Sequence, residues 1–293
     1  MRSFILGTDW WTDCDDAIAV RLLARAAKAG RIRLCGVALN ACMPYSVASL
    51  KGFLAYEGLR DVPLGIDRSA TDFGGSPSYQ QRWADSLCPT ATNADAEDAL
   101  RLYRRLLAAA EGKVEIIEIG FLQVVAELLK SGPDDISPLS GCELVAQKVS
   151  KLWVMAGKWD ADGEKEHNFC LNPRTRLAGK EFCELCPAPV TFLGWEVGYG
   201  VISGGELAPG DPLQGVLADH GSPNGRHSWD PMLTLLALIG NEERAGYDTV
   251  SGSASVDLET GANYFKKHPC GTHKFVVKKQ ENAFYAAQIN KLL

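Results

Sequence analysis

Residues 4–17 read Phe4-Ile5-Leu6-Gly7-Thr8-Asp9-Trp10-Trp11-Thr12-Asp13-Cys14-Asp15-Asp16-Ala17, an apolar run followed by a loop with four carboxylates within eight residues. The run predicts a strand, and apolar residues recurring from Ala17 to a C-cap at Gly30 predict an amphipathic helix. Four clustered carboxylates repel one another, and a helix N-terminus offers only about half a charge. A hard divalent cation, Ca²⁺ or Mg²⁺, is the natural partner. The alternative is a solvated loop in which Asp15 or Asp16 caps the helix.

Strand-like runs alternate with helical patterns along the rest of the chain. The patterns predict strands at 31–39, 62–65, 113–120, 149–156 and 188–194, and helices at 46–59, 94–111, 121–130 and 231–240. Residues 72–92 and 158–172 read as loops, and 247–280 as a β-hairpin around Glu259-Thr260-Gly261. This alternation predicts an α/β fold with a mainly parallel sheet, helices on both faces and a C-terminal β-hairpin. No break in composition divides residues 1–293 into two domains.

The composition excludes several classes of protein. Hydrophobic residues make up 46% and charged residues 23% of the chain, and the net charge is −6 without a basic stripe, so nucleic acid is not an expected partner. The N-terminus has no signal-peptide pattern and no apolar run spans a bilayer, which predicts a cytoplasmic protein without membrane contact. Nine cysteines predict buried, reduced thiols, and Cys183 and Cys186 have only half the pattern of a zinc site.

Four segments carry a more specific pattern. Residues 7–17 follow the form D-T-D-x-x-x-D-x-D-D-A, and residues 119–126 follow G-P-L-T-N-x-A. Residues 154–157 with 166–173 follow M-G-G … E-F-N … D-P, and residues 229–231 follow H-D-P. In this order they resemble the motifs of the inosine-uridine preferring nucleoside hydrolase family, in its variant with a longer acidic loop.

The resemblance implies a Ca²⁺-dependent N-glycosidase that splits a ribonucleoside, or a related N-riboside, into ribose and free base. It implies a role in nucleoside catabolism and purine salvage, a small-molecule nucleoside or riboside as partner, and a homo-oligomer, either a dimer or a tetramer.

Residue roles follow from the same resemblance. Asp9 matches the general base, which is also a calcium ligand, and the other implied ligands are Asp16, Asp230 and the backbone carbonyl of Gln123. The implied sugar-binding residues are Asp15, Asn40, Glu166 and Asn168. This chemistry is coherent, because carboxylates stabilise an oxocarbenium-like transition state and Ca²⁺ accepts about 6–8 oxygen ligands.

The chain departs from the family pattern at several positions. Gly7 replaces the first Asp, and Asp13 is an additional carboxylate that we consider as a second base or ligand. Trp229 stands where many members have a histidine that protonates the leaving base; His227, two residues away, is an alternative acid. Without a histidine, the resemblance implies that aromatic stacking activates the base, as in the purine-specific branch of the family. Among Trp10, Trp11, Trp83 and Trp229, we prefer Trp11 and Trp229 for base contact because they adjoin implied ligands, and stacking predicts a preference for purines.

Two other classes of α/β protein lack their characteristic motifs in this sequence. A haloacid-dehalogenase-type phosphatase needs D-x-D, which Asp9-Trp10-Trp11 lacks, and a dinucleotide site needs a G-x-G-x-x-G that no strand precedes. Two alternatives stay open: a protein of the same fold that binds a nucleoside or sugar without hydrolysing it, and a hydrolase of a non-nucleoside riboside.

Overall fold

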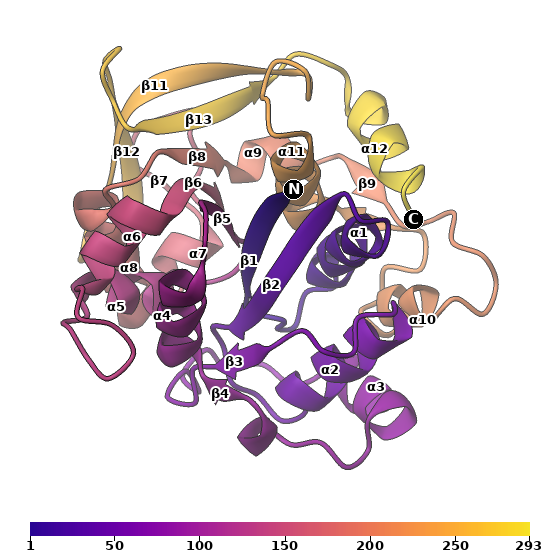
Figure 1. Ribbon diagram of the computed structural model, residues 1–293. Coiled ribbons are helices and arrows are strands. Elements are labelled where there is room, and N and C mark those ends of the chain that lie inside the picture. Colours follow the sequence, from indigo (N-terminus) through magenta and orange to yellow (C-terminus); the bar gives the residue numbers. More distant parts are fainter.

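One large sheet organises the computed structural model, which describes residues 1–293 (Figure 1). The strand order is β4-β3-β2-β1-β5-β6-β8-β13-β11-β12-β7. The strands as far as β13 are parallel to their neighbours: β4 (Glu97–Asp98), β3 (Leu64–Ile66), β2 (Ile32–Leu39), β1 (Arg2–Thr8), β5 (Val114–Glu118), β6 (Val149–Met155), β8 (Val190–Leu193) and β13 (His273–Lys278). The others pair antiparallel: β11 (Tyr247–Val256), β12 (Ala262–Lys267) and β7 (Glu164–Lys165). The predicted, mainly parallel α/β fold is confirmed.

Helices cover both faces of this sheet. One face packs against α1 (Asp15–Lys28), α2 (Ser46–Tyr56) and α11 (Trp229–Ile239), and the other against α4 (Ala99–Ala109), α5 (Gln123–Lys130), α6 (Gly141–Lys148) and α8 (Pro173–Leu185). Shorter elements lie around them: α3 (Gln80–Leu87), α7 (His167–Cys170), α9 (Trp195–Gly198), α10 (Pro212–Asp219), α12 (Asn282–Asn290), a 3₁₀ turn at Asn93–Asp95, and a separate pair of strands, β9 (Ile202–Ser203) and β10 (Arg226–His227).

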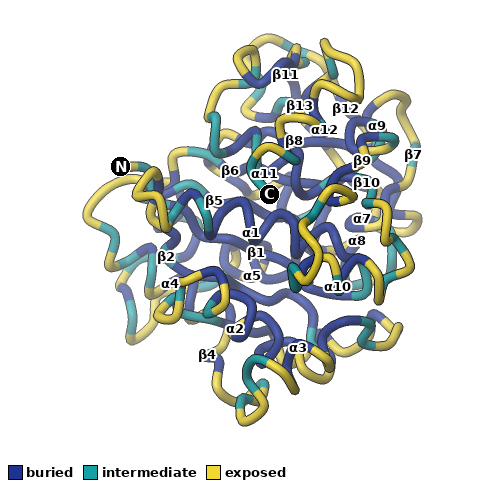
Figure 2. Tube along the Cα trace, turned by 90° about the vertical axis from the view of Figure 1, so that its right-hand side faces the viewer, coloured by how far each residue is buried: buried dark blue, intermediate teal, exposed yellow.

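Side-chain alternation divides the interior into two cores. Along β1, Phe4 and Leu6 belong to the core beneath α1, whereas Ile5 belongs to the core beneath α4 and α5. Successive side chains of a strand point to opposite faces, so a central strand with both faces covered is apolar throughout. Figure 2 shows how burial varies along the chain: the central strands and α1 are mostly buried, and the exposed residues are concentrated in the peripheral loops.

The chain order creates a switch point between β1 and β5. From β1 the chain builds the sheet outward through β2, β3 and β4, then returns to add β5 on the other side of β1. In open α/β sheets such a point leaves a crevice beyond the carboxyl ends of the two strands, and ligands bind there. Asp9 follows β1 and Ile119 follows β5, so the acidic loop lies at this crevice.

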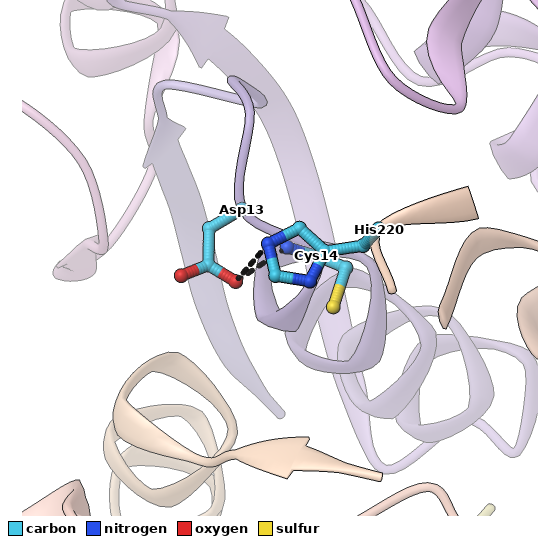
Figure 3. Close-up of side chains that lie close together, drawn as sticks. All are labelled: Asp13, Cys14 and His220. Carbon is cyan, nitrogen blue, oxygen red and sulfur yellow. Dashed lines mark hydrogen bonds and ion pairs between the residues drawn. The ribbon is translucent and has the colours of Figure 1, made fainter. Parts of the chain in front are cut away.

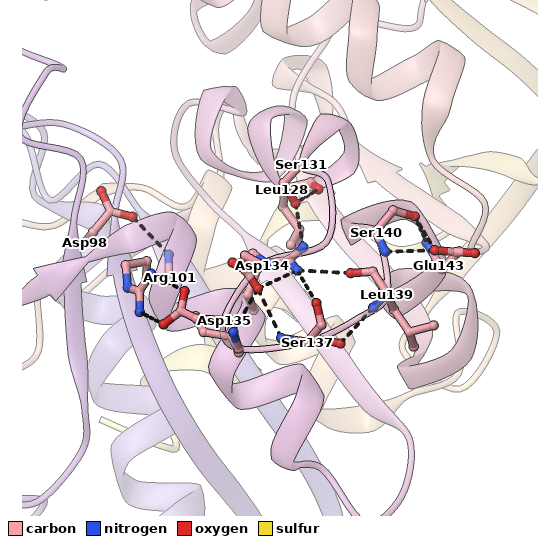
Figure 4. Close-up of polar contacts among 12 residues, drawn as sticks. Asp98, Arg101, Leu128, Ser131, Asp134, Asp135, Ser137, Leu139, Ser140 and Glu143 are labelled. Atoms are coloured by element: carbon pink, nitrogen blue, oxygen red, sulfur yellow. Dashed lines mark hydrogen bonds and ion pairs between the residues drawn. The ribbon is translucent and has the colours of Figure 1, made fainter.

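Ion pairs fasten the connection between α5 and α6 to α4 (Figure 4). Arg101 pairs with Asp135 at 2.8 Å, and the Asp134 carboxylate accepts the backbone N–H groups of Ile136 and Ser137 at 3.0 Å. Ser140 and Glu143 form a capping box at the start of α6. These contacts lie away from the acidic loop, so we assign them to stability.

Several local predictions are corrected. Residues 72–92 include α3, residues 158–172 include β7 and α7, and the helix predicted from 94 begins at Ala99 because Glu97–Asp98 pair with β3. The predicted hairpin forms from β11 and β12, but β13 extends it and joins it to β8. Asp15 and Asp16 are the first residues of α1, so neither is its N-cap.

Of the nine free cysteines, only Cys14, Cys183 and Cys186 are buried. No helix has the length and hydropathy needed to cross a bilayer.

Candidate active site

The acidic loop is held tightly at both ends. Thr8, the last residue of β1, donates its hydroxyl proton to the Asp16 carboxylate. The backbone N–H of Trp10 donates to Thr8 Oγ1 at 3.1 Å and to Asp16 Oδ1 at 3.3 Å. Trp10 adopts a left-handed φ of 45°, and its fully buried indole bonds to Ser49 Oγ at 2.8 Å. Such backbone strain costs about 1–3 kcal/mol and persists where the surroundings enforce it.

Three carboxylates from two helices converge beside this loop. One oxygen of each of Asp15, Asp16 and Asp230 lies within 4.8 Å of the others, and all three residues are buried. The backbone N–H of Asp230, at the start of α11, donates to Asp15 Oδ2 at 3.1 Å. Burial, reinforced by mutual repulsion, raises the pKa of each of the three carboxyls well above its usual range. The group has the donor type and the uncompensated charge that suit a hard divalent cation.

Asp9 lies next to this group. Burial raises its pKa to about 7; a hydrogen bond with Asp16 opposes the rise, and the charges of Asp15 and Asp13 add to it. The sequence-based ligand set was Asp9, Asp16 and Asp230, whereas the three converging oxygens belong to Asp15, Asp16 and Asp230. Asp9 therefore adjoins the cluster, and Asp15, predicted to bind the sugar, lies within it.

The additional carboxylate, Asp13, forms an ion pair. Arg226 donates from Nε to Asp13 Oδ1 at 2.9 Å and from Nη2 to Oδ2 at 2.6 Å. Burial favours a higher pKa for Asp13, but the Arg226 bonds and charge outweigh it and lower the pKa. Figure 3 shows Asp13 with Cys14 and His220, whose Nε2 lies 3.6 Å from Asp13 Oδ1. We do not assign a second metal site to these three residues, because the guanidinium already occupies both oxygens of Asp13.

A cavity of about 290 Å³ opens above the acidic cluster. Six carboxylates and one arginine line it, together with three tryptophans. The lining residues are Asp9, Trp11, Thr12, Asp13, Asp15, Asp16, Ile119, Met155, Glu166, His167, Asn168, Trp195, Arg226, Trp229 and Asp230. The predicted residues Asp9, Asp13, Asp15, Asp16, Glu166, Asn168, Trp11, Trp229 and Asp230 are thus brought together, from segments spread over most of the chain.

Glu166 and Asn168 form the polar wall opposite the acidic loop. The Glu166 carboxylate accepts the backbone N–H of Gly157 through Oε2 and that of Asn168 through Oε1, both at 2.9 Å. Asn168 Nδ2 donates to the carbonyl of Met155, the last residue of β6, at 2.9 Å. Burial raises the pKa of Glu166 to about 7. Both side chains are therefore fixed before a ligand arrives.

Asn40 and Gln123 lie behind the cavity wall. Asn40 is buried, its backbone N–H donates to the Thr8 carbonyl at 2.9 Å, and its Oδ1 accepts from the Phe121 N–H at 3.1 Å. The Gln123 side chain donates to the Asn40 carbonyl. Neither residue lines the cavity, so their predicted contacts with sugar and metal stay predictions.

The tryptophans divide between core and cavity. Trp10 and Trp83 pack with Phe53 and Tyr79 in the core, whereas Trp11 and Trp229 line the cavity. Trp229 Nε1 donates to the Trp195 carbonyl at 2.8 Å, and the Arg226 guanidinium carbon lies 5.2 Å from the Trp229 ring centroid. Through Arg226, the ion pair with Asp13 also helps to fix the orientation of Trp229.

His227 lies outside the cavity. Its Nδ1 accepts the Gly200 N–H at 2.9 Å, and its ring stacks on Tyr199 at 4.7 Å. Sequence reasoning missed Trp195, Arg226 and His167. Trp195 had a recognisable signal, since it directly follows the predicted strand at 188–194, at the end where ligands are bound. Arg226 had no comparable signal.

Comparisons with known proteins identify the fold. No family model matches the chain, and no curated protein matches its sequence. The purine-preferring ribonucleoside hydrolase from Gardnerella vaginalis superimposes with a TM-score of 0.72 at 16% identity, over 99% of each chain. The inosine-uridine preferring nucleoside hydrolase from Bacillus anthracis gives 0.68 at 14% identity, over 100% of each chain. The type III effector XopQ, complexed with adenosine diphosphate ribose, gives 0.68 at 16% identity, over 99% of this chain and 93% of its own. The resemblance predicted from the motifs is confirmed in three dimensions: residues 1–293 have the fold of the nucleoside hydrolases.

Proposed function

We propose that this protein is a Ca²⁺-dependent N-glycosidase that hydrolyses a ribonucleoside to ribose and free base. The observation that carries the proposal is the convergence of Asp15, Asp16 and Asp230 beside Asp9 at the switch point of the sheet. The likeness to two nucleoside hydrolases over almost the whole chain supports it.

In this proposal Asp9, Asp16 and Asp230 hold the cation, with the Gln123 carbonyl as a further ligand and Asp15 close by. The donor set fits Ca²⁺, because it consists of hard oxygens whose clustered, buried charges need compensation. When bound, the ion supplies positive charge that orients water and the sugar hydroxyls. The Asp9 carboxylate, which adjoins the cluster and lines the cavity, accepts the proton of the attacking water.

The remaining polar residues bind the sugar. Asp15, Glu166 and Asn168 face the cavity with their oxygen and nitrogen atoms fixed by backbone contacts. Cleavage of an N-glycosidic bond develops positive charge on the sugar ring, and preorganised carboxylates stabilise that charge. The same residues hold the hydroxyl groups in place and restrict the access of bulk water.

The aromatic residues bind the base. Trp11, Trp195 and Trp229 line the cavity together, and stacking on indole rings suits a planar heterocycle. We therefore propose a purine ribonucleoside as the substrate and stacking as the means of activating the leaving group. His227 is not the preferred acid, because it lies outside the cavity with Nδ1 already occupied.

The deciding experiment is a panel of ribonucleosides assayed for release of reducing sugar, with Ca²⁺ and with a chelator. We expect hydrolysis of purine ribonucleosides that a chelator abolishes and added Ca²⁺ restores. Hydrolysis that a chelator leaves intact would refute the role of the metal.

A second candidate is non-hydrolytic binding of a ribosyl ligand. The likeness to XopQ, which was solved with adenosine diphosphate ribose, favours this alternative. Binding of a riboside by calorimetry without release of sugar from any member of the panel would support it over hydrolysis.

A further inference from the structure

Gly7 and Glu118 are partners on neighbouring strands beneath the acidic site. They are paired in the register of β1 and β5. A Cβ built on Gly7 would overlap the Glu118 carboxyl group, closer to both oxygens and to Cδ than non-bonded atoms approach. Gly7 is therefore a glycine because a side chain from β5 occupies the space that a β1 side chain would take.

Glu118 is an unusual group in this position. It is 1% exposed, no cation pairs with it, and burial raises its pKa to about 8. Its Oε1 accepts the hydroxyl of buried Tyr103, and its Oε2 accepts Asn40 Nδ2 at 3.4 Å. A buried carboxyl is costly unless its hydrogen bonds are satisfied, and here both oxygens have partners.

The orientation of Asn40 depends on this carboxyl. The backbone N–H of Phe121 is a donor only, so the amide oxygen of Asn40 must face it, and Nδ2 must face an acceptor. Glu118 provides that acceptor. The backbone N–H of Asn40 also donates to the Thr8 carbonyl, which joins the end of β2 to the end of β1. The bond from the Phe121 N–H to Asn40 Oδ1 joins both to the turn between β5 and α5.

The turn held by Asn40 lies against the acidic site. A Cβ on Gly120 would lie 2.6 Å from Asn40 Oδ1 and 2.9 Å from the Cβ of Asp9, so the turn, Asn40 and Asp9 are in contact. Gln123, at the end of the turn, donates its side chain to the Asn40 carbonyl. A change in the Asn40 side chain would therefore be transmitted to both Asp9 and the Gln123 backbone.

We propose that Glu118 is a positioning residue, whose carboxyl crosses Gly7 to orient Asn40 and, through it, the β5–α5 turn and Asp9. Its effect on metal affinity and turnover rests on the proposed function, whereas its effect on the turn does not. Since Glu118 reaches the site only through Asn40, removing its acceptor should loosen the turn without removing any group that faces the cavity.

The test compares three variants. Glu118→Leu keeps the bulk and removes the acceptor. Glu118→Gln is the matched control, because its amide oxygen still accepts from Asn40 while its NH₂ donates to the Tyr103 oxygen. The double variant Gly7→Asp with Glu118→Gly supplies a carboxylate to the same space from β1 instead of β5. It tests whether a carboxylate in this space is sufficient, whichever residue carries it.

Amide hydrogen exchange at Phe121 is the primary readout, followed by Ca²⁺ affinity from calorimetry and by kcat. In Glu118→Leu we expect exchange at Phe121 to be about tenfold faster, as for the loss of one hydrogen bond, and Ca²⁺ binding about 10–100-fold weaker, as for other groups that orient metal ligands. In Glu118→Gln and in the double variant Gly7→Asp with Glu118→Gly, hydrogen exchange at Phe121, Ca²⁺ affinity and kcat should all stay close to the wild-type values.

Unchanged protection of Phe121 in a folded Glu118→Leu protein would overturn the proposal, and so would faster exchange with Ca²⁺ affinity and kcat intact. If Glu118→Leu does not fold, the double variant Gly7→Asp with Glu118→Gly decides. A folded double variant in which the Phe121 amide is unprotected would contradict the proposal that a carboxyl group in this space orients Asn40, whichever strand supplies it. A wild-type protein that neither binds Ca²⁺ nor releases ribose would refute the proposed function, and the Phe121 measurement would still decide whether Glu118 orients the turn.

Discussion

Burial raises the pKa of Asp9 to about 7, and the charges of Asp15 and Asp13 add to the rise. We expect Asp9→Asn to fold normally and to lower turnover by about 10²–10⁴-fold, the usual contribution of a general base. Steady-state kinetics with purine ribonucleosides, together with a thermal melt, checks both parts. Asp160→Asn, at an exposed carboxylate paired with Lys158, is the control and should retain full turnover. Near-normal turnover of Asp9→Asn would instead favour Asp13 as the base.

Trp229 is the second residue with a distinct expectation. It lines the cavity, whereas His227 stacks on Tyr199 outside it. We expect Trp229→Ala to reduce turnover of purine ribonucleosides more than His227→Ala does, and purines to be hydrolysed faster than pyrimidines. Rates for inosine, adenosine and uridine with each variant measure this. Efficient hydrolysis of uridine together with inactivation by His227→Ala would assign the proton donor to His227 instead.

At the scale of elements, we expect the loop between β1 and α1 to couple stability to pH and, in the proposed function, to Ca²⁺. The carboxyls of Asp15, Asp16 and Asp230 have raised pKa values, and Asp9 reaches about 7 against an ordinary value of 3.8. Without a cation, the folded state therefore binds more protons than the unfolded state above pH 4, so stability falls as the pH rises from about 4 through 7.

Ca²⁺ should reverse this trend, because it replaces the protons that compensate the carboxylates. Thermal melts at pH 5 and pH 8, each with chelator and with Ca²⁺, should show the larger Ca²⁺-dependent stabilisation at pH 8. Asp16→Ala should abolish both the stabilisation and the Ca²⁺ uptake seen by calorimetry. Equal stabilisation at the two pH values would contradict the linkage.

The packing of Trp10 against α2 and α3 constrains the acidic loop. Its indole is fully buried against Phe53, Tyr79 and Trp83, although it lies within the acidic loop. We expect Trp10→Ala to lower the free energy of unfolding by about 3–5 kcal/mol, as for other large aromatic truncations. Tyr56→Ala, at a side chain that is 50% exposed, is the control and should change it by less than about 0.5 kcal/mol. Urea denaturation followed by fluorescence measures both.

At the scale of the whole molecule, the charges of the chain and of the cavity predict which ligands are disfavoured. The chain carries a net charge of −6, and six carboxylates but only one arginine line the cavity. Since Asp13 already pairs with that arginine, a phosphate group would meet no free cationic side chain in the cavity. We expect a nucleoside 5′-phosphate to be a much poorer substrate than its nucleoside at low ionic strength, and added salt to narrow the gap. Comparable kcat/KM for inosine and its 5′-phosphate at low salt would contradict this.

The sequence by itself determined the fold class and identified most of the residues that line the cavity. Strands such as β1 are apolar throughout because both faces are covered, and the Asp-rich loop follows directly from a strand, so local patterns were sufficient. The sequence patterns do not predict the helices α6, α8, α9, α10 and α12, and they predict loops at α3 and α7. The apolar positions of these helices become decisive only where they pack against the cores.

The tertiary structure alone decided which side chains meet. The separation of Trp10 from Trp11, the pairing of Arg226 with Asp13 and the placing of Glu118 across Gly7 join residues that are adjacent or far apart in sequence without any shared pattern. Side-chain contacts of this kind depend on strand register and helix packing, which are set by the whole set of buried contacts. A periodic sequence signal reports which face of an element is buried; it does not report the neighbour against which that face is packed.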